Sequence, residues 1–135
     1  MLFRSHDGNH IVSGSSDKSV RVWDASTGAA LQQLNGHTHY VNSVAFSHDG
    51  IHIVSGSSDK SVRIWDASTG EALQLLNGHT DNVRSVAFSH DGIHIVSGSQ
   101  DKSVRVWDAS TGAALQQLNG HTHHVNSVAV MTSND

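Results

Sequence analysis

The amino-acid sequence predicts an all-β protein made of three copies of one four-stranded antiparallel sheet. The first observation is a repeat: Trp23, Trp65 and Trp107 are spaced by 42 residues, and such a period indicates an array of equal structural units. The second is the closeness of the copies, since residues 9–50 and 51–92 differ at only seven positions. The third is that each copy holds four short segments separated by polar turns, as an antiparallel meander requires.

The first two strands of the copy that starts near residue 40 form a predicted hairpin. Residues 40–47, YVNSVAFS, alternate around Val41 and Val44, and the block HDG follows them. Asp-Gly is a favoured two-residue hairpin turn because both of its positions tolerate positive φ. Residues 52–57, HIVSGS, then supply the returning strand.

The third and fourth segments complete this sheet. Residues 61–66, SVRIWD, are rich in β-branched and aromatic side chains, as strands prefer, and the turn ASTG follows them. Residues 71–78, EALQLLNG, are expected to form the fourth strand, although their apolar spacing would also suit a helical turn. A lone four-stranded sheet cannot bury both of its faces, so we expect the sheets to stack face to face.

Three features at fixed spacing resemble the WD40 repeat. They are the pair Gly36-His37, the turn residue Asp59, and the pair Trp65-Asp66 that closes the third strand. The resemblance covers essentially the whole chain and implies a β-propeller, whose sheets, or blades, are arranged around a central axis. The block SHDG departs from the family, which often has Pro before the Asp, and we expect no change of fold from that difference.

The implied organisation is a single WD40 repeat array over residues 1–135. Its expected parts are a first blade over about 2–35, a second over about 40–77, a third over about 82–119, and an extra inner strand over about 124–130. Near-identical tandem copies also resemble the C-terminal arrays of fungal and bacterial NACHT/STAND-type receptors. In those receptors the propeller is a ligand-sensing region beside a nucleotide-binding domain.

Each copy carries Ser, Asp and Trp at constant spacing, with a His before them. This set invites a hydrolase interpretation, but an active site would also need an oxyanion hole and a cleft, and three identical copies of one have no rationale. The resemblance implies instead a hydrogen-bonded tetrad in each blade: Asp accepts from His, His contacts Ser, and Ser contacts the Trp indole. The chain is therefore predicted not to be an enzyme. The implied tetrads are His37, Ser55, Asp59 and Trp65; His79, Ser97, Asp101 and Trp107; and Ser13, Asp17 and Trp23, completed by a second chain's residue at the position of His121.

The twelve histidines raise the question of a metal site. His48 and His52 are four residues apart, but they flank a predicted hairpin turn, and the pair recurs in the other copies. We interpret them as cross-strand neighbours at the surface, because a metal site needs three or four converging ligands. The run HTHH at 121–124 could bind metal adventitiously. The chain has no Cys, which excludes a disulfide framework and thiolate ligands, and neither a metal nor a cofactor is predicted.

The charge pattern narrows the choice of partners. The net charge is −4 and basic residues are scattered singly, so nucleic acid is not a predicted partner. The longest apolar run is a few residues, far short of a membrane span. The amino-terminal MLFRSHDG lacks the apolar region of a signal peptide, and a cytoplasmic location is the resulting expectation.

Differences among the copies gather in the connection from each fourth strand to the next first strand and beside the turn Asp. In an antiparallel meander these places share one edge of the sheet, so we expect the variable residues to form one rim. The resemblance implies a rim that binds protein partners, and neutral drift at exposed positions is the alternative. The predicted rim residues are Ser16, His39, Tyr40, Asn42, Ser58, Asp81, Asn82, Arg84, Gln100, His123, His124 and Asn126.

Propellers typically have four to eight blades, so three copies are expected to form an open arc. The first blade has only the stub LFR for its first strand, and its tetrad His would fall before Met1, whereas His121 and residues 124–130 are surplus. We therefore expect a homodimer, in which two chains close head to tail into a six-bladed ring. The alternatives are a piece of a longer WD40 array, such as the sensor region of a STAND-type receptor, a designed repeat scaffold without a ligand, and the hydrolase.

Overall fold

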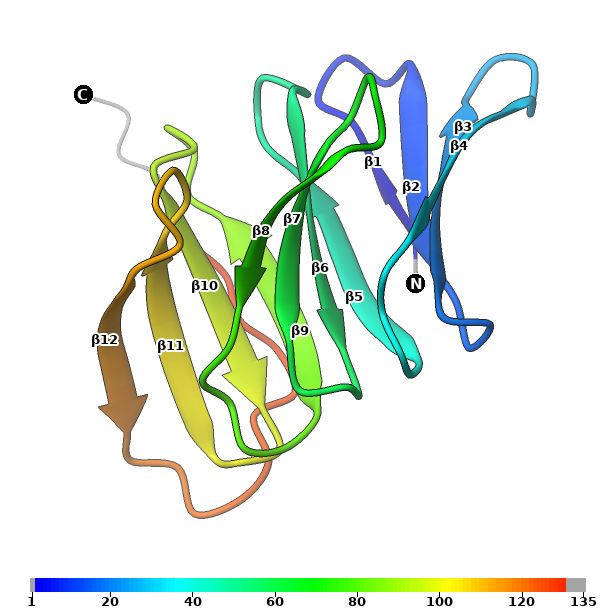
Figure 1. The fold of residues 1–135 in the computed structure, drawn as a ribbon. Helices are drawn as coiled ribbons and strands as arrows, with labels where there is room; N and C mark the ends of the chain where they lie inside the picture. Colours follow the sequence, from blue (N-terminus) through cyan, green and yellow to red (C-terminus); the bar gives the residue numbers. More distant parts are fainter. Residues whose placement is uncertain (1, 131–135) are drawn as a thin grey trace.

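The computed structural model describes residues 2–130, in which twelve strands form three sheets (Figure 1). The first blade consists of β1 (Leu2–Arg4), β2 (His10–Gly14), β3 (Ser19–Asp24) and β4 (Ala30–Asn35). The second consists of β5 (Val41–Phe46), β6 (His52–Ser57), β7 (Val62–Asp66) and β8 (Ala72–Leu76). The third consists of β9 (Val83–Phe88), β10 (His94–Ser99), β11 (Ser103–Asp108) and β12 (Ala114–Asn119).

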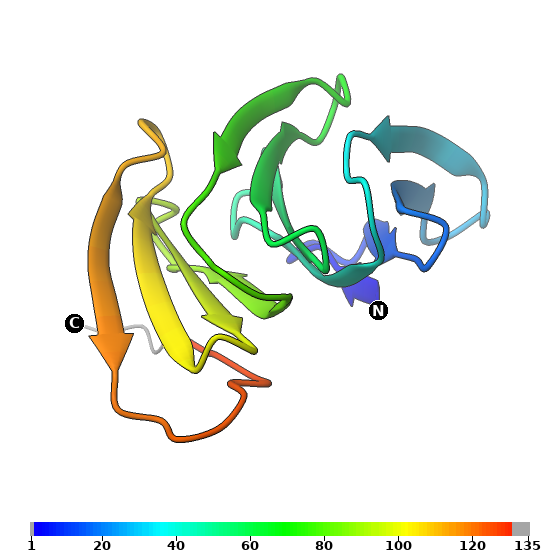
Figure 2. The ribbon, with the colours of Figure 1, turned by 60° about the horizontal axis from the view of Figure 1, so that its bottom comes forward.

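Each blade is an antiparallel meander in which every strand pairs with its neighbours in sequence. The first strand of each blade packs against the blade before it: β5 contacts β1 and β2, and β9 contacts β5 and β6. The fourth strands β4, β8 and β12 lie on the outside, so the three sheets form an open arc (Figure 2). The prediction of an all-β protein with three four-stranded propeller blades is confirmed.

The hydrophobic core lies between blades rather than within them. Val12 and Leu34 of the first blade pack with Val44, Ile53 and Trp65 of the second, and all five are 3% exposed or less. The same set of positions fills the space between the second and third blades. Because burial of a large apolar side chain stabilises by about 1.5–3 kcal/mol, each blade depends on its neighbour for stability.

Glycines in the second strands allow the blades to approach. A Cβ added to Gly56 on β6 would lie 2.7 Å from Cγ1 of Val83 and 2.9 Å from Cγ1 of Val86, both on β9. Gly14 on β2 stands in the same relation to Val41, at 2.6 Å from Cγ1. These spacings are below ordinary contact distances, so a side chain at either glycine would push the next blade away.

The segment over 71–78 forms strand β8 and not a helical turn, because it pairs with β7 in register from Val62↔Leu76 to Trp65↔Ala72. The two-residue Asp49-Gly50 turn was wrong: only Gly50 has positive φ, at 75°, and the connection covers residues 47–51. Asp49 Oδ1 accepts from Ser47 Oγ–H at 2.6 Å and from Ile51 N–H at 2.9 Å, which stabilises this longer loop.

The extra inner strand over 124–130 is also absent as a strand from the described residues, since none of these positions belongs to a sheet. A strand requires a neighbour with free backbone groups, and the adjacent third blade already uses β9, β10, β11 and β12. Residues 124–130 nevertheless lie in a defined place against the third blade, where Val125 is 5% exposed.

Candidate functional site

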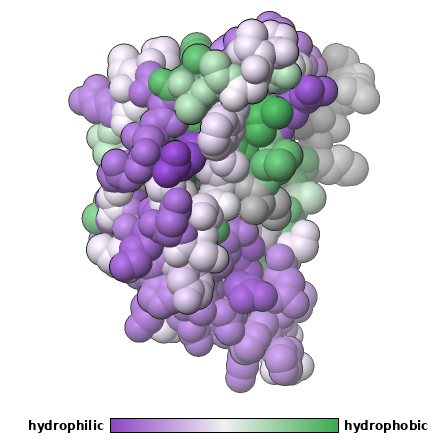
Figure 3. All heavy atoms as spheres, turned by 90° about the vertical axis from the view of Figure 1, so that its right-hand side faces the viewer, coloured by the Kyte–Doolittle hydropathy of each residue, from purple (hydrophilic) through white to green (hydrophobic). Residues whose placement is uncertain are grey.

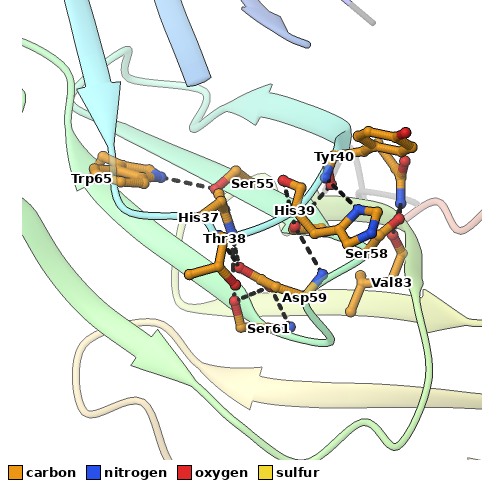
Figure 4. Close-up of polar contacts among 12 residues, drawn as sticks. His37, Thr38, His39, Tyr40, Ser55, Ser58, Asp59, Ser61, Trp65 and Val83 are labelled. Atoms are coloured by element: carbon orange, nitrogen blue, oxygen red, sulfur yellow. Dashed lines mark hydrogen bonds and ion pairs between the residues drawn. The ribbon is translucent and has the colours of Figure 1, made fainter. Parts of the chain in front are cut away.

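A chain of hydrogen bonds links four side chains of the second blade (Figure 4). The Trp65 indole Nε1–H donates to Ser55 Oγ at 2.8 Å, and Ser55 Oγ lies 2.6 Å from His37 Nε2. His37 Nδ1 lies 2.8 Å from Asp59 Oδ2. Because the Asp59 carboxylate only accepts, Nδ1 carries the proton, and Nε2 accepts from the Ser55 hydroxyl.

Four different elements supply this tetrad. His37 lies in the connection between β4 and β5, Ser55 is on β6, and Trp65 is on β7. Asp59 lies in the turn between β6 and β7, where its Oδ2 also accepts from the backbone N–H of Thr38 at 3.1 Å. The tetrad therefore ties the segment that leaves the first blade to the strands of the second blade.

The Asp59 carboxylate is held in its charged form. Burial alone raises its pKa, but hydrogen bonds from His37, from the Ser61 side chain and from backbone N–H groups outweigh burial and bring the pKa well below its usual range. Ser61 Oγ–H donates to Asp59 Oδ1 at 2.5 Å. Ser61 was not among the predicted site residues, although its place two residues after Asp59 is a position from which a hydroxyl often bonds a turn Asp.

The third blade repeats this geometry. His79 Nδ1 lies 2.8 Å from Asp101 Oδ2, and His79 Nε2 lies 2.6 Å from Ser97 Oγ, which accepts from Trp107 at 2.9 Å. Burial lowers the pKa of His79, which favours the neutral ring that the hydrogen-bond pattern requires. Burial raises the pKa of Asp101, but hydrogen bonds from Ser103 and His79 bring it down to about 2.

The first blade holds only part of the tetrad. Trp23 Nε1–H donates to Ser13 Oγ at 2.9 Å, as in the other blades. No histidine among residues 2–130 joins Asp17; its carboxylate accepts from Ser19 Oγ–H at 2.6 Å and faces the Arg21 guanidinium at 3.6 Å. His121, which is expected to act as the tetrad histidine in the first blade of a second chain, is exposed.

The tetrads offer no nucleophile to a substrate. Ser55 and Ser97 expose no surface, and the His37 and His79 side chains are at most 1% exposed. Each Ser hydroxyl accepts from an indole and donates its only proton to an imidazole. In the residues described, the arrangement fixes a loop to a sheet and does not resemble a catalytic site.

The predicted rim residues meet in pairs at one edge of the blades. Asn42 Nδ2–H donates to Ser58 Oγ at 2.9 Å and to the Val83 carbonyl of the next blade at 3.0 Å. In the third blade the equivalent pair is Arg84 and Gln100, with Nη1 3.5 Å from Oε1. In these two blades, the first strand therefore meets the turn between the second and third strands.

Other rim residues project from this edge. The rings of His39 and Tyr40 lie 4.4 Å apart, edge to face, and Tyr40 is 50% exposed. The backbone carbonyl of Tyr40 accepts hydrogen bonds from Ser57 Oγ–H and from Ser58 N–H. The remaining predicted positions are half-buried at Asp81 and Asn82 and exposed at Ser16, His123, His124 and Asn126.

The opposite edge carries a column of histidines. The His48 ring lies between those of His6 and His90, with centroids 3.8 and 3.9 Å away. The interpretation of His48 and His52 as cross-strand neighbours was therefore wrong: His52 pairs in register with Asp66, and His48 contacts its equivalents in other blades. Lost hydration and the two neighbouring histidines lower the pKa of His48.

These three rings border a hollow of about 370 Å³ on the inner side of the arc, together with Phe3, Arg4, Phe46, Ser47, Phe88, Ser89 and Val130. Within residues 2–130, no three His, Asp or Glu side chains converge on a point that could hold one metal ion. The same residues include no helix that is long and apolar enough to cross a membrane.

Comparison with known proteins assigns this arrangement to a family. The model described as "WD domain, G-beta repeat" matches residues 4–24, 28–66 and 70–108. The chain belongs to the WD40 repeat family. Each of the two longer matches contains the fourth strand of one blade and the first three strands of the next, so a WD40 repeat is offset from a blade by one strand.

Named WD40 relatives are longer than this chain. The chromatin assembly factor 1 subunit FAS2 homolog of Oryza sativa subsp. japonica is 52% identical over 42 residues, which cover 31% of this chain and 8% of that protein. Two solved structures, of U3-55K and of the RRP9 WD40 repeats, each superpose with a TM-score of 0.90 at 30% identity. The superposition covers 93% of this chain and 40% of each of those chains.

Proposed function

We propose that this WD40 chain is a protein-interaction scaffold without enzymatic activity, and that its rim is the partner-binding surface. The observation that supports this most directly is the placement of sequence differences. Otherwise near-identical copies differ at Asn42 and Arg84 and at Ser58 and Gln100, and the structure joins these residues in pairs at one edge. Buried tetrads hold that edge in place, and a rigid frame that presents varied loops suits recognition of another protein.

The relatives support the same class of function. One of them is named as a subunit of an assembly factor, which is a description of that protein and not of this chain. The rim also has the composition of a recognition surface, since an exposed aromatic ring, Tyr40, lies among hydrogen-bonding side chains.

A swap between repeats tests the rim. The variant His39→Asp, Tyr40→Asn, Asn42→Arg, Ser58→Gln gives the second blade the rim of the third. The control Ala29→Glu, Gln33→Leu makes the same kind of swap at the residue before the outer strand β4 and within that strand. Partners enriched from cell extract by the parent chain are identified and then measured as purified pairs. The rim swap should weaken binding about tenfold or more, and the control should not, at equal melting temperature; equal binding by both would contradict the proposal.

We also propose that two chains close head to tail into a six-bladed ring. The support comes from residues 125–128, which dock on the third blade as the first strand of a further blade would. Val125 N–H donates to the Ser99 carbonyl at 2.9 Å, and Val41 N–H makes the equivalent bond to Ser15 at 3.0 Å. A Cβ added to Gly98 would lie 2.7 Å from Cγ1 of Val125, and a Cβ added to Gly56 would lie at the same distance from Cγ1 of Val83.

The first blade has an apolar face that no other blade covers. Ile53 and Trp65 are at most 1% exposed, but their equivalents Ile11 and Trp23 are only half-buried, because no blade covers them. Figure 3 faces this side of the molecule and shows hydrophobic residues gathered in the upper part of an otherwise hydrophilic face. A second chain's third blade would cover this face and bring His121 toward Asp17.

The solution mass tests ring closure. Light scattering coupled to gel filtration should give twice the chain mass of 14.4 kDa, and Val125→Asp with Val128→Asp should return the chain to a monomer. The control Leu75→Asp changes an exposed apolar residue of β8 in the second blade. A parent chain that stays monomeric at high concentration would contradict the ring and favour an arc that other blades complete.

A further inference from the structure

Strand β1 occupies the position that a first strand holds in the other blades. Leu2 pairs in register with Ser13, and Arg4 pairs with Ile11. The second blade pairs Val44 with Ser55 and Phe46 with Ile53 in the same way. β1 thus fills the inner edge of β2, but with three residues where β5 has six.

β1 is weakly held at that edge. Leu2 is 66% exposed and Phe3 is 42% exposed, whereas their equivalents Val44 and Ala45 on β5 are at most 5% exposed. Burial of apolar surface supplies most of the free energy that fixes a strand, so pairing of β1 with β2 rests mainly on a few backbone hydrogen bonds. Short exposed strands of this kind open easily.

The proposed ring needs the same edge. Residues 128–130 of a second chain stand three periods of 42 residues after residues 2–4. By the register of β9, its Val128 would pair with Ser13 and its Val130 with Ile11, which are the positions that Leu2 and Arg4 now hold. Two strands cannot pair with one edge, so the ring cannot form around β1 as it stands.

We propose that the ring closes by strand exchange, in which β1 leaves the edge of β2 and residues 124–130 of a second copy of this chain take its place. This inference rests on the proposed ring. The incoming segment is longer than β1, and its Val125 and Val128 are already packed on the third blade that delivers them. The exchange therefore replaces an exposed three-residue strand with a longer one whose Val125 is already buried on its own third blade.

The tetrad of the first blade gains its missing member in the same step. In the second blade, a Cβ at Gly36 would lie 2.9 Å from Arg63 Nη1, and the buried Arg63 Nε has no hydrogen-bond partner. In the first blade Arg21 Nε–H donates instead to Ser19 Oγ at 3.3 Å, and its guanidinium faces Asp17. The incoming Gly-His pair would displace the Arg21 guanidinium, and the His121 imidazole would take over Asp17 and Ser13.

A reversible lock on β1 tests the exchange. The variant Arg4→Cys with Ile11→Cys places two cysteines at paired positions of β1 and β2 in a chain that otherwise has none. Oxidation ties β1 to its edge, and reduction frees it in the same protein. We expect the reduced variant to dimerise like the parent chain and the oxidised variant to remain monomeric with an unchanged Trp fluorescence spectrum. The single variant Arg4→Cys is the control for the substitution.

A second variant weakens β1 rather than fixing it. Leu2→Ser with Phe3→Ser removes its apolar contacts, and we expect the dimer dissociation constant to fall about tenfold, since the competing strand is less stable. Hydrogen exchange of the dimer should show rapid exchange at residues 2–4 and protection at 124–130.

The outcomes separate the two proposals. A dimer formed equally well by the oxidised and reduced forms would overturn strand exchange and leave the ring intact. Protection of residues 2–4 in the dimer would do the same. If neither the reduced variant nor the variant with weakened β1 dimerises, the proposed ring itself is wrong, and strand exchange is overturned with it.

Discussion

The first and second blades have nearly the same sequence but different tetrads, and the difference shows which part of the motif belongs to a blade. The Ser-Trp bond is 2.9 Å in the first blade and 2.8 Å in the second, so two paired strands suffice to form it. The His-Asp bond forms only where the connection from a preceding blade supplies the histidine, as the segment between β4 and β5 supplies His37.

The missing histidine changes its surroundings. Asp17 is 52% exposed and faces Arg21, whereas the Asp59 side chain is 7% exposed and hydrogen-bonded to His37. An exposed ion pair contributes little to stability, but hydrogen bonds to a buried carboxylate contribute more. The tetrad is therefore a joint between consecutive blades.

Removal of the tetrad histidine should have the largest effect. His37→Ala removes the buried imidazole that accepts from Ser55 and donates to Asp59, and we expect a loss of about 3 kcal/mol in the free energy of unfolding. The control His121→Ala removes an exposed side chain from the same motif and should change the stability of the separated chain by less than about 0.5 kcal/mol. Urea unfolding of the two variants measures the difference, and equal losses would contradict the comparison.

Low pH should have the second-largest effect, because it protonates the tetrad carboxylates and lowers the stability of the fold. The folded-state pKa of Asp101 is about 2, which is below its usual value of 3.8. The charged carboxylate therefore stabilises the fold fully at pH values above 3.8, and this contribution is lost as the pH falls through about 2. We expect up to about 2 kcal/mol from this group.

Asp101→Asn should lose that stability near neutral pH and show a flatter acid dependence in chemical unfolding between pH 4 and 2. Asp17→Asn in the first blade is the matched control, and its loss should be smaller because Asp17 is more exposed. A loss at Asp17 as large as that at Asp101 would remove the distinction between the blades.

The glycines of the Gly-His pairs offer a third contrast. Gly36→Ala would place a methyl group 2.9 Å from Arg63 Nη1 and 3.0 Å from a Trp65 ring carbon, and Gly120→Ala meets no atom within 4 Å. We expect Gly36→Ala to cost about 1–2 kcal/mol, since part of the arginine can move.

Gly120→Ala should be neutral in the separated chain and should weaken the proposed dimer, where Gly120 would lie against a second chain's first blade. Thermal melts at low concentration and dissociation constants at high concentration separate these effects. A Gly120→Ala dimer of parental affinity would contradict the placement of this pair in the ring.

The histidine column should give the smallest effect, because it is exposed and joins all three blades alike. His48 is held below its usual pKa by lost hydration and by His6 and His90, while Asp49 acts in the opposite direction. Its pKa is lowered on folding, so this group's contribution to stability diminishes as pH falls below about 6.5.

An NMR titration of the parent chain should give His48 a pKa below 6.5. The double variant His6→Gln, His90→Gln should bring it back toward 6.5, with His124→Gln as a distant control. An unchanged titration in the double variant would contradict a role for the neighbouring rings.

Much of this architecture follows from the repeat. The Trp spacing and the β-branched segments predicted the number and order of strands. The family resemblance grouped residues that hydrogen bonds join in the second and third blades. Local turn chemistry was less predictable, because the Ser47 and Asp49 side chains favour a longer loop than the two-residue turn that Asp-Gly suggests. The contribution of Ser61 was missed because a serine in a Ser-rich turn carries no distinguishing signal. The cytoplasmic location and the absence of a nucleic-acid partner stay predictions.

The sequence by itself determined what depends on neighbours along the chain, which is the period, the number of strands and their order. Only the tertiary structure decided what depends on contacts between blades. It placed His48 between His6 and His90 instead of beside His52, and it left residues 124–130 docked but unpaired. The physical reason is that a β-strand is completed by the backbone of another strand, and the sequence of one segment does not say which strand that will be.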